Sequence, residues 1–558
     1  HKFFHNAGFS ISPCEKFMAY SVDCVGNEFY TTRVRNLHTK EDLPDTIKDV
    51  IGAPTWNNES NGFYYTKLDK NWRPNKVYYH KIGDEQKNDK LIYSEQDKTF
   101  RLGLSKSTDG RYIFMTASSS TSQELMIIKN DYQIKTLIKR SKDHLFEVDH
   151  FNNIFYLLTN DKGKNFRLIK ATSEKNLVEK KWVEIIKHSK NDYLTDFQTY
   201  DDHLIITKKI SGVPKIFVFN YDMELLDELK FEDDSYYASH TYSWHDDDGF
   251  IVNYSSLRTP STTYKYFFKE KSLKTLKEQI IPSGYKKEHY VSERIYVKSR
   301  DGLVKIPVSL IYKKSLFHSN GKNPLLLYGY GSYGISIPAT FNTNILSLLD
   351  RGFVFAIAHV RGGDDLGFEW YESAKFLNKK RTFDDFSDIL KFFVKSKYSS
   401  TKKISVMGGS AGGMLVGVTL NNESNLINSA IADVPFVDVL NTMLDETLPL
   451  TPGEFKEWGD PKEKKFFDYI LSYSPYDNIK KIAYPNILVL AGLHDPRVTY
   501  WEPAKYVAKL RESKTDNNIL VLETEMHAGH KGATARFERY KELAKKYAFL
   551  LSTHNINS

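Results

Sequence analysis

The residues of this chain that could do chemistry begin with a serine set between glycines. The segment Gly408-Gly409-Ser410-Ala411-Gly412 follows a strand-like apolar run, residues 404–407, and precedes an apolar helical stretch. A serine in a GxSxG turn between a strand and a helix is exposed at the amino terminus of that helix, where it can act as a nucleophile. We therefore predict Ser410 as a nucleophile and the N–H of Ala411 as one donor to a developing oxyanion.

A serine nucleophile needs a base, and the base needs an orienting carboxylate. In α/β-hydrolases the carboxylate and then the histidine follow the serine along the chain. Asp495 comes after the strand-like run NILVLAG, and the loop after the next run, ILVLET, holds His527 and His530. We select His530 because Gly529 and Gly532 flank it, which should let its loop reach Ser410. No HExxH motif or cysteine cluster accompanies the histidines, so neither a metal site nor a cofactor is predicted.

A second oxyanion donor should lie in the loop after an earlier strand. The run PLLLYGYGSYG starts at Pro324 and places a glycine- and tyrosine-rich turn at the end of a buried strand. A tyrosine hydroxyl can donate there in place of a second backbone N–H. Spacing alone does not rank Tyr328, Tyr330 and Tyr333.

The elements that must position these residues follow residue 290. A hairpin turning at Asp301-Gly302 comes first, and apolar strands then alternate with helical patterns. This alternation predicts a mainly parallel, doubly wound sheet, so residues 289–558 are interpreted as an α/β-hydrolase catalytic domain. The predicted strands are 325–328, 353–360, 404–407, 430–434, 487–491 and 519–522, and the predicted helices include 382–397, 503–512 and 536–551.

Residues 1–288 show a different pattern, in which short apolar strands are separated by polar turns. Similar units recur roughly every 45–50 residues, which is the spacing of four-stranded β-propeller blades. An irregular β-sandwich with accidental spacing is the alternative. Because a propeller must close its ring and the chain lacks an initial Met, we expect seven blades with an amino-terminal part outside this chain. The six visible units begin at Ser12, Asn61, Asp109, Asn152, Asp201 and Asp247.

The composition limits the possible partners. The net charge of +8 is small against 78 basic and 70 acidic residues, so a solvated mixed surface is favoured over nucleic-acid binding. The sequence contains no run of 18 consecutive apolar residues, so no membrane-spanning helix is predicted. Cys14 and Cys24 are expected to be buried free thiols in a reducing compartment, and we expect a cytoplasmic protein. Nothing in the sequence specifies an oligomeric state.

Several long motifs resemble one known family. They include YGYGSYG, LLDRGFVFAIAHVRGG, MGGSAGGMLVGV and GLHDPRVTYWEPAKYVAKLRE, and together the matches span most of residues 290–550. They resemble the prolyl oligopeptidase family, in particular its oligopeptidase B branch, and the propeller half is similar more loosely. The resemblance implies a serine peptidase that cleaves short peptides after Arg or Lys, with the propeller restricting entry of folded proteins.

The resemblance also implies roles for individual residues. Ser410, Asp495 and His530 take the triad roles, and Tyr330 takes the role of the oxyanion tyrosine. Arg497 falls where related enzymes bind a substrate backbone carbonyl. Glu454, in GEFKEWG, matches the acid that faces the basic side chain before the scissile bond, and a carboxylate facing a guanidinium gives that selectivity a physical basis. Tyr333 and Glu457 complete the candidate substrate-binding residues.

The chain departs from the family pattern at three positions that bear on specificity. Lys456 stands where a second glutamate is typical, and Pro338 and Thr340 stand where two aspartates often serve the second substrate residue. Losing carboxylates and gaining an ammonium should weaken selection for paired basic residues.

Two alternatives remain open at this point. A prolyl or acylaminoacyl peptidase of the same family would need a different pocket, and Glu454 speaks against it because proline pockets are apolar. A non-catalytic binding protein would use the propeller as an interaction platform, and the intact set of Ser, Asp, His and oxyanion residues counts against it.

Overall fold

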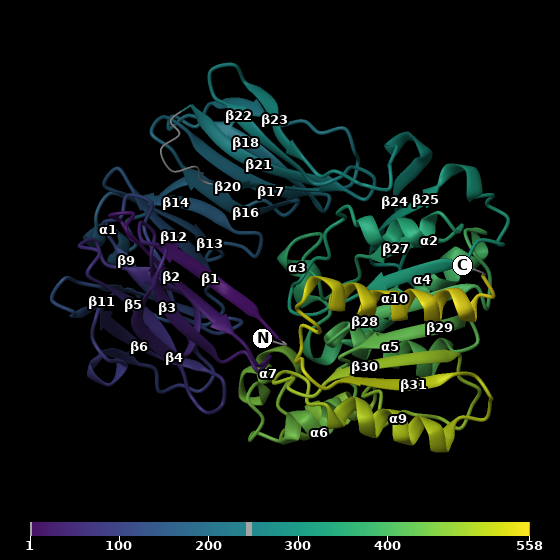
Figure 1. Cartoon of the computed structure of the whole chain (residues 1–558). Coiled ribbons are helices and arrows are strands. Elements are labelled where there is room, and N and C mark those ends of the chain that lie inside the picture. Colours follow the sequence, from purple (N-terminus) through teal and green to yellow (C-terminus); the bar gives the residue numbers. More distant parts are fainter. Residues whose placement is uncertain (1–2, 242–247, 557–558) are drawn as a thin grey trace.

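The computed structural model describes residues 3–241 and 248–556, and it divides into an all-β half and an α/β half (Figure 1). The last strand of the first half ends at Glu278, and the first strand of the second half begins at Tyr290. We place the domain boundary, predicted between residues 288 and 289, in this linker. Asp247, the first residue of the sixth predicted unit, lies outside the described residues.

The first sheet of the all-β half contains two blades joined through one strand. Strand β4 is 15 residues long and pairs with β3 through its first half and with β5 through its second half. It is therefore the last strand of one blade and the first strand of the next. The seven strands are β1 (His5–Ile11), β2 (Phe17–Asp23), β3 (Tyr30–Asn36), β4 (Asp42–Trp56), β5 (Gly62–Leu68), β6 (Pro74–Lys81) and β7 (Lys90–Ser94).

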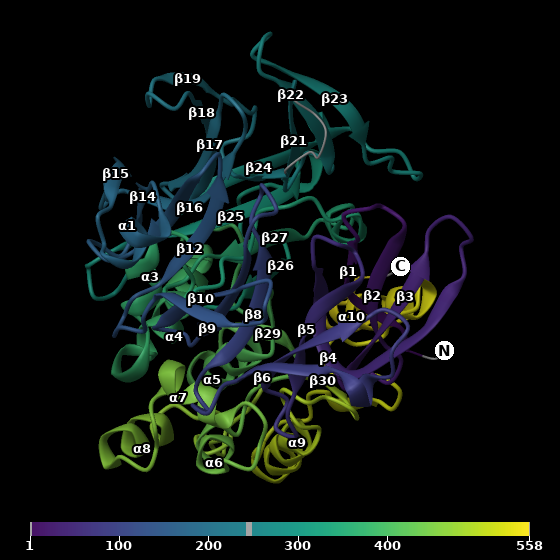
Figure 2. The same ribbon diagram turned by 90° about the vertical axis from the view of Figure 1, so that its left-hand side faces the viewer.

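Four separate four-stranded antiparallel sheets follow, as the repeat spacing predicts, and Figure 2 shows them succeeding one another in chain order. The described residues thus form the propeller blades that the sequence predicts, with the first two fused. The strands are β8 (Arg101–Lys106), β9 (Ile113–Ser118), β10 (Gln123–Ile128), β11 (Ile134–Ile138), β12 (Phe146–Phe151), β13 (Ile154–Thr159), β14 (Arg167–Ala171), β15 (Val183–Ile186), β16 (Asp192–Thr199), β17 (Leu204–Ile210), β18 (Val213–Phe219), β19 (Leu225–Glu228), β20 (Tyr236–Thr241), β21 (Gly249–Ser256), β22 (Thr262–Phe267) and β23 (Ser272–Glu278), with α1 (Glu174–Val178) between β14 and β15.

A buried histidine links the two fused blades. His80, fully buried at the end of β6, has its Nδ1 2.7 Å from Asp89 and its Nε2 2.9 Å from Asp45. Burial alone would lower the pKa of His80, but the hydrogen bonds to the two carboxylates outweigh it and raise the pKa to about 9. The imidazole is therefore charged at neutral pH and balances two buried carboxylates.

Replacing His80 by leucine is expected to destabilise the propeller by about 3–5 kcal/mol at pH 7, because it leaves two buried carboxylates without their cation. Since the pKa is raised above 6.5, this stabilisation is complete below about pH 6.5 and is lost as the pH rises through about 9. Urea unfolding at pH 6.5, 8 and 9.5 would measure it, with His38→Leu at an exposed position as the control. A loss of stability independent of pH would contradict the charged state.

The α/β half contains one eight-stranded sheet. Its order is β24-β25-β27-β26-β28-β29-β30-β31, with the first three strands antiparallel and the rest parallel. This confirms the predicted α/β-hydrolase class, and the strand limits differ from the predictions by at most three residues. The strands are β24 (Tyr290–Lys298), β25 (Lys305–Lys313), β26 (Leu325–Gly329), β27 (Val354–Ala358), β28 (Ile404–Gly409), β29 (Ile427–Asp433), β30 (Asn486–Gly492) and β31 (Leu520–Glu525).

Helices cover both faces of this sheet because its strands bury alternate side chains on opposite sides. Leu325 and Leu327 pack into the core under α4 (Lys380–Lys395), α5 (Ala411–Glu423) and α9 (Trp501–Ser513), whereas Leu326 packs into the core under α2 (Leu346–Leu349) and α10 (Arg536–Thr553). The helices of this half are α2 (Leu346–Leu349), α3 (Phe368–Glu372), α4 (Lys380–Lys395), α5 (Ala411–Glu423), α6 (Val439–Leu444), α7 (Thr451–Trp458), α8 (Lys464–Leu471), α9 (Trp501–Ser513) and α10 (Arg536–Thr553).

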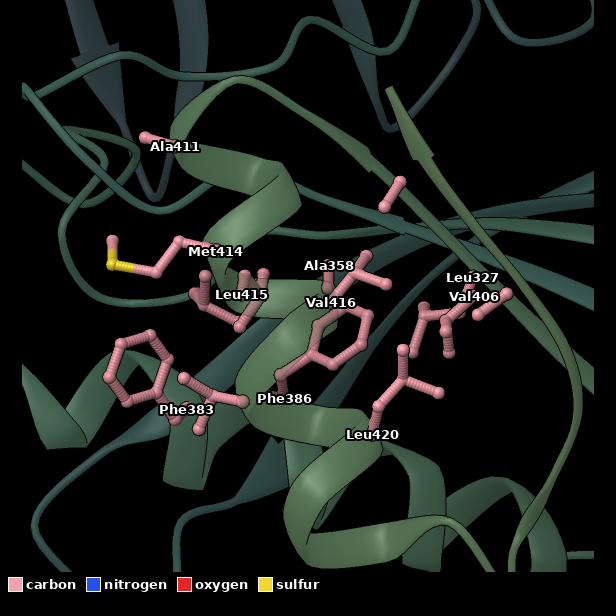
Figure 3. Packing of buried hydrophobic residues seen from close by; sticks show 14 of the residues in the cluster. Leu327, Ala358, Phe383, Phe386, Val406, Ala411, Met414, Leu415, Val416 and Leu420 are labelled. Carbon is pink, nitrogen blue, oxygen red and sulfur yellow. The ribbon is translucent and has the colours of Figure 1, made fainter. Parts of the chain in front are cut away.

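Helix α5, which begins directly after the predicted nucleophile Ser410, is deeply buried. Figure 3 shows Leu415, Val416 and Leu420 among side chains from the strands and from α4, including Val406 and Phe386. Every residue from Ala411 to Asn421 is buried. A helix packed on all sides gives the turn at its amino terminus a rigid support.

Three further features concern the sequence predictions. Both cysteines are free, but the expectation that they are buried is wrong: Cys14 is exposed and Cys24 is half-buried, because both lie in turns at strand ends. Within the described part of the chain, no helix has the length and apolar character needed to cross a membrane. The same residues contain no group of His, Cys, Asp and Glu arranged to hold a metal ion.

Candidate active site

The predicted nucleophile lies on a strained turn. Ser410 stands between the end of β28 and the start of α5 with φ +56° and ψ −121°, a conformation that non-glycine residues rarely adopt. Only glycine fits beside it, since a Cβ on Gly408 would be 2.3 Å from the carbonyl oxygen of Gly412. Ala411 is the first residue of α5, so its N–H belongs to the turn whose donors have no partner within the helix.

Asp495 and His530 are brought together by the ends of two neighbouring strands, β30 and β31. Asp495 Oδ2 is 2.7 Å from His530 Nδ1, and its Oδ1 accepts the N–H groups of Arg497 and Val498 at 2.8 and 3.0 Å. The carboxylate is thus fixed and turned toward the imidazole. Among residues 3–241 and 248–556, the hydrogen bonds do not include one between His530 and Ser410.

The loop that carries His530 packs against the propeller. A Cβ on Gly529 would be 2.0 Å from the carbonyl oxygen of Gly26, so glycine is required here for the close approach of two backbones. Phe4 N–H also donates to Thr534 Oγ1 at 2.9 Å, and Lys531 Nζ lies 3.3 Å from His5 Nε2. The position of His530 therefore depends on contacts that the propeller makes.

The turn after β26, residues 329–334, is called the tyrosine turn below. Tyr330 lies beside Ser410. Burial raises the pKa of Tyr330 and a hydrogen bond with Ser410 lowers it, with a net rise to about 12. The hydroxyl of Tyr330 therefore stays protonated at neutral pH and can donate a hydrogen bond. Tyr333 points elsewhere, because its hydroxyl donates to Glu454 at 2.9 Å.

Two adjoining cavities lie between the domains. The larger, about 620 Å³, reaches Ser410 and Tyr330, and the smaller, about 320 Å³, continues past Tyr333 and Glu454. The propeller contributes Trp72, Arg101 and residues 118–120 to the larger cavity and Ser120 and Tyr193 to the smaller. Neither Pro338 nor Thr340 is among the described residues that line either cavity.

Glu454 is the carboxylate that lines both cavities. Its Oε2 accepts hydrogen bonds from Tyr333 Oη at 2.9 Å and from Trp458 Nε1 at 2.7 Å. Burial raises the pKa of Glu454 to about 7, because the ionised carboxylate is poorly solvated there. Arg101 of the propeller lines the larger cavity together with Glu454, and its positive charge favours the ionised carboxylate. Lys456, on the same helix α7, is exposed.

Glu457 is buried in the wall of the smaller cavity. Its Oε1 accepts the N–H of Tyr333 at 2.9 Å, and its Oε2 accepts the hydroxyl of Tyr371. The nearby Asp364 carboxylate is 2.6 Å from Lys209 Nζ of the propeller. Two acids of this wall therefore already have partners inside the protein.

Arg497 is held by the propeller. Its Nε and Nη2 donate to the two carboxylate oxygens of Glu28 at 2.9 and 2.8 Å, and its guanidinium lies 5.4 Å from the centre of the Trp72 ring. Trp72 Nε1 donates to Glu28 O at 3.0 Å. Glu28, Trp72 and Arg101 could not be identified from the sequence, because no local pattern marks a residue that meets the site only across the domain interface.

An α/β-hydrolase domain with a serine elbow, next to a propeller domain, is the architecture of a serine hydrolase with a propeller cap. Comparison with known proteins makes the class more specific. A family model described as "Prolyl oligopeptidase family" matches residues 339–556, and one described as "Prolyl oligopeptidase, N-terminal beta-propeller domain" matches residues 1–279. The chain belongs to the prolyl oligopeptidase family and is a serine peptidase.

Individual relatives agree with this assignment. The chain is 36% identical to dipeptidyl aminopeptidase BI of Pseudoxanthomonas mexicana, covering 100% of this chain and 77% of the relative. It is 37% identical to protease 2 of Moraxella lacunata, covering 96% and 77%. The solved structure of oligopeptidase B from Leishmania major is similar with a TM-score of 0.95 at 33% identity, covering 99% of this chain and 79% of that one. Oligopeptidase B from Trypanosoma brucei, with covalently bound antipain, gives 0.94 at 34% identity, covering 100% and 80%.

Proposed function

We propose that this serine peptidase hydrolyses short peptides after Arg or Lys. The observation that carries the proposal is the Glu454 carboxylate, which lines the same cavity as Ser410 and continues into the smaller cavity beyond. A basic side chain that enters between them would exchange water for a carboxylate in a poorly solvated site, where charge-assisted hydrogen bonds are strong. The similarity to oligopeptidase B structures supports this assignment.

The proposed mechanism is acyl transfer. His530 takes the proton of Ser410, which attacks the carbonyl carbon of the substrate, while Asp495 holds the imidazole and stabilises its charged form. Tyr330 and the N–H of Ala411 donate to the oxyanion. The leaving amine takes the proton from His530, and water then hydrolyses the acyl-enzyme by the same route.

Formation of the Ser410–His530 hydrogen bond is the step that the domain contacts control in this proposal. The His530 loop touches Gly26 and His5 of the first blade, and Arg497 is paired with Glu28 of the same blade. Arg497 keeps its predicted role on a substrate carbonyl, for which its Nη1 is the donor not bonded to Glu28.

The substrates that we propose are peptides with basic residues, small enough to pass the propeller, and we propose the cytoplasm as the location of the protein. Two free cysteines in 558 residues fit a reducing compartment. One relative is named a dipeptidyl aminopeptidase, an enzyme that removes dipeptides from a free amino terminus. A peptide with a blocked amino terminus distinguishes the two activities, because only an endopeptidase is expected to cleave it.

Replacing Glu454 by glutamine is expected to lower kcat/KM for blocked Arg peptides by about 100-fold, since a hydrogen bond to a charged group contributes about 1.5–3 kcal/mol. The matched Ala peptide should change little. Fluorogenic peptides with Arg, Lys, Pro or Ala before the scissile bond would measure this, with Lys456→Gln on the exposed side of the same helix as the control. Preference of the unsubstituted enzyme for Pro would instead favour the prolyl peptidase alternative.

The same carboxylate should make specificity depend on pH. Burial raises the pKa of Glu454 to about 7, and only the ionised form pairs with a basic side chain. The ratio of kcat/KM for Arg and Ala peptides is therefore expected to rise with pH through about 7, and effects common to both peptides cancel in this ratio. A flat ratio between pH 5.5 and 8.5 would argue against Glu454 as the partner.

A further inference from the structure

Two buried charged side chains contact the tyrosine turn without taking part in the proposed chemistry. Lys379, at the start of α4, is 1% exposed, and its Nζ donates to the carbonyl oxygen of Gly331 and to Ser332 Oγ, the latter at 2.9 Å. Glu457, in α7, is 3% exposed and accepts the N–H of Tyr333. The turn is thus held on its carbonyl side by an ammonium and on its N–H side by a carboxylate.

A lysine in this position is costly. Lysine is rarely fully buried unless it is paired, and Lys379 makes no ion pair in the part of the chain that the structure describes. Burial lowers the pKa of Lys379 to about 8, while the charge of Glu457 opposes that shift. The ring of Trp458, 5.2 Å from Nζ, adds a cation–π contact. The hydrogen bonds that this ammonium donates both go to residues of the tyrosine turn, so we expect Lys379 to affect the site through that turn.

The tyrosine turn has a conformation that needs such support. Gly331 has φ +73°, and Tyr333 has φ +60°, which is uncommon for a residue with a bulky side chain. A Cβ on Gly331 would be 2.4 Å from Thr382 Cγ2, so the turn is also wedged against α4. Charge-assisted hydrogen bonds from both sides hold this backbone more firmly than neutral ones would.

We propose that Lys379 and Glu457 are positioning residues that fix the tyrosine turn, and through it the hydroxyl of Tyr330 beside Ser410. This role rests on the proposed function of Tyr330 as an oxyanion donor. In this role Glu457 does not contact a basic substrate side chain directly. Its Oε1 already accepts a hydrogen bond from the N–H of Tyr333, and its Oε2 accepts one from the hydroxyl of Tyr371.

The test compares kcat and KM for blocked Arg and Ala peptides. Lys379→Met removes both hydrogen bonds at similar side-chain length, and misplacing a catalytic donor by about 1 Å costs up to about 100-fold. We expect kcat to fall by about 10- to 100-fold for both peptides, with KM changed by less than about 3-fold. Glu457→Gln should likewise lower kcat for both peptides. A rise of KM confined to the Arg peptide in Glu457→Gln would overturn the positioning role of Glu457.

A double-mutant cycle with Tyr330→Phe shows whether Lys379 acts through the tyrosine. Tyr330→Phe alone should lower kcat by about 100-fold or more, as expected for loss of one oxyanion donor. In the Tyr330→Phe background, Lys379→Met is expected to change kcat by less than about 2-fold. Effects that multiply would show a general structural role and overturn the proposal.

Controls keep the outcomes distinct. Lys380→Met, at the exposed neighbouring lysine, should leave kcat within about 2-fold. Ser332→Ala removes only one hydrogen-bond acceptor of Lys379 and replaces Lys379→Met as the test variant if Lys379→Met does not fold. Its expected effect is a 3- to 10-fold loss of kcat. Unchanged kcat in both variants, with Tyr330→Phe impaired, would overturn the positioning role alone. No effect of Tyr330→Phe would overturn the proposed oxyanion role together with it.

Discussion

Replacing Ser410 by alanine is expected to lower kcat for Arg peptides by about 10⁴- to 10⁶-fold, the loss found when a serine nucleophile is removed while the oxyanion donors remain. Alanine meets the same backbone strain at φ +56° as serine does, and α5 beneath it is buried on all sides. We therefore expect the variant to fold with little change in stability, so that the loss of activity is chemical.

Active-site labelling with a fluorophosphonate would accompany the kinetics of Ser410→Ala. The parent enzyme should be labelled once, at Ser410, and the variant should not be labelled. Ser424→Ala, just beyond the other end of α5, is the matched control and should keep activity within about 2-fold. A folded Ser410→Ala variant that kept more than about 1% of the activity would contradict the assignment of the nucleophile.

The second large effect is expected for Asp495→Asn, with kcat lowered by about 10⁴-fold and KM nearly unchanged. The asparagine oxygen can still accept the N–H groups of Arg497 and Val498, which hold Oδ1 at present. Its amide nitrogen then faces His530 Nδ1, and that imidazole takes the tautomer with its proton on Nε2. Such an imidazole cannot accept the proton of Ser410.

The other histidine of the loop provides the control for this prediction. His527 is exposed, and His527→Gln should keep kcat within about 3-fold, whereas His530→Gln should match Asp495→Asn. Thermal unfolding would check that the three variants are folded. A loss in His527→Gln as large as that in His530→Gln would show that the base was assigned to the wrong residue.

Features that depend on neighbouring residues could be predicted from the sequence. The elbow around Ser410 could be predicted because a glycine pair, a serine and a buried strand and helix lie within one short segment, and only glycine fits at Gly408. The α/β alternation predicted the sheet, since strands buried on both faces have near-continuous apolar runs. The pairing of Asp495 with His530 followed from their places after successive strands, whose carboxyl ends meet at one sheet edge.

The repeat spacing predicted four-stranded blades but not the fusion of the first two. Strand β4 serves both because it continues for 15 residues without a turn. Between Asp42 and Trp56 the sequence does contain a glycine and two prolines, which are ordinary turn signals. Pairing with β3 and β5 kept the strand continuous despite them, a tertiary effect that local propensity does not report.

The orientation of the site residues toward one another could not be predicted from the sequence and follows from tertiary packing. Tyr328, Tyr330 and Tyr333 could not be ranked by spacing, because the direction of each hydroxyl depends on the backbone conformation at the end of β26 and in the turn after it, where Gly331 and Tyr333 both have positive φ. Arg497 meets Glu28 across 469 residues of sequence. Strands and elbows follow from local sterics and periodic burial, whereas buried charges are placed by partners that reach them only after the two domains pack together.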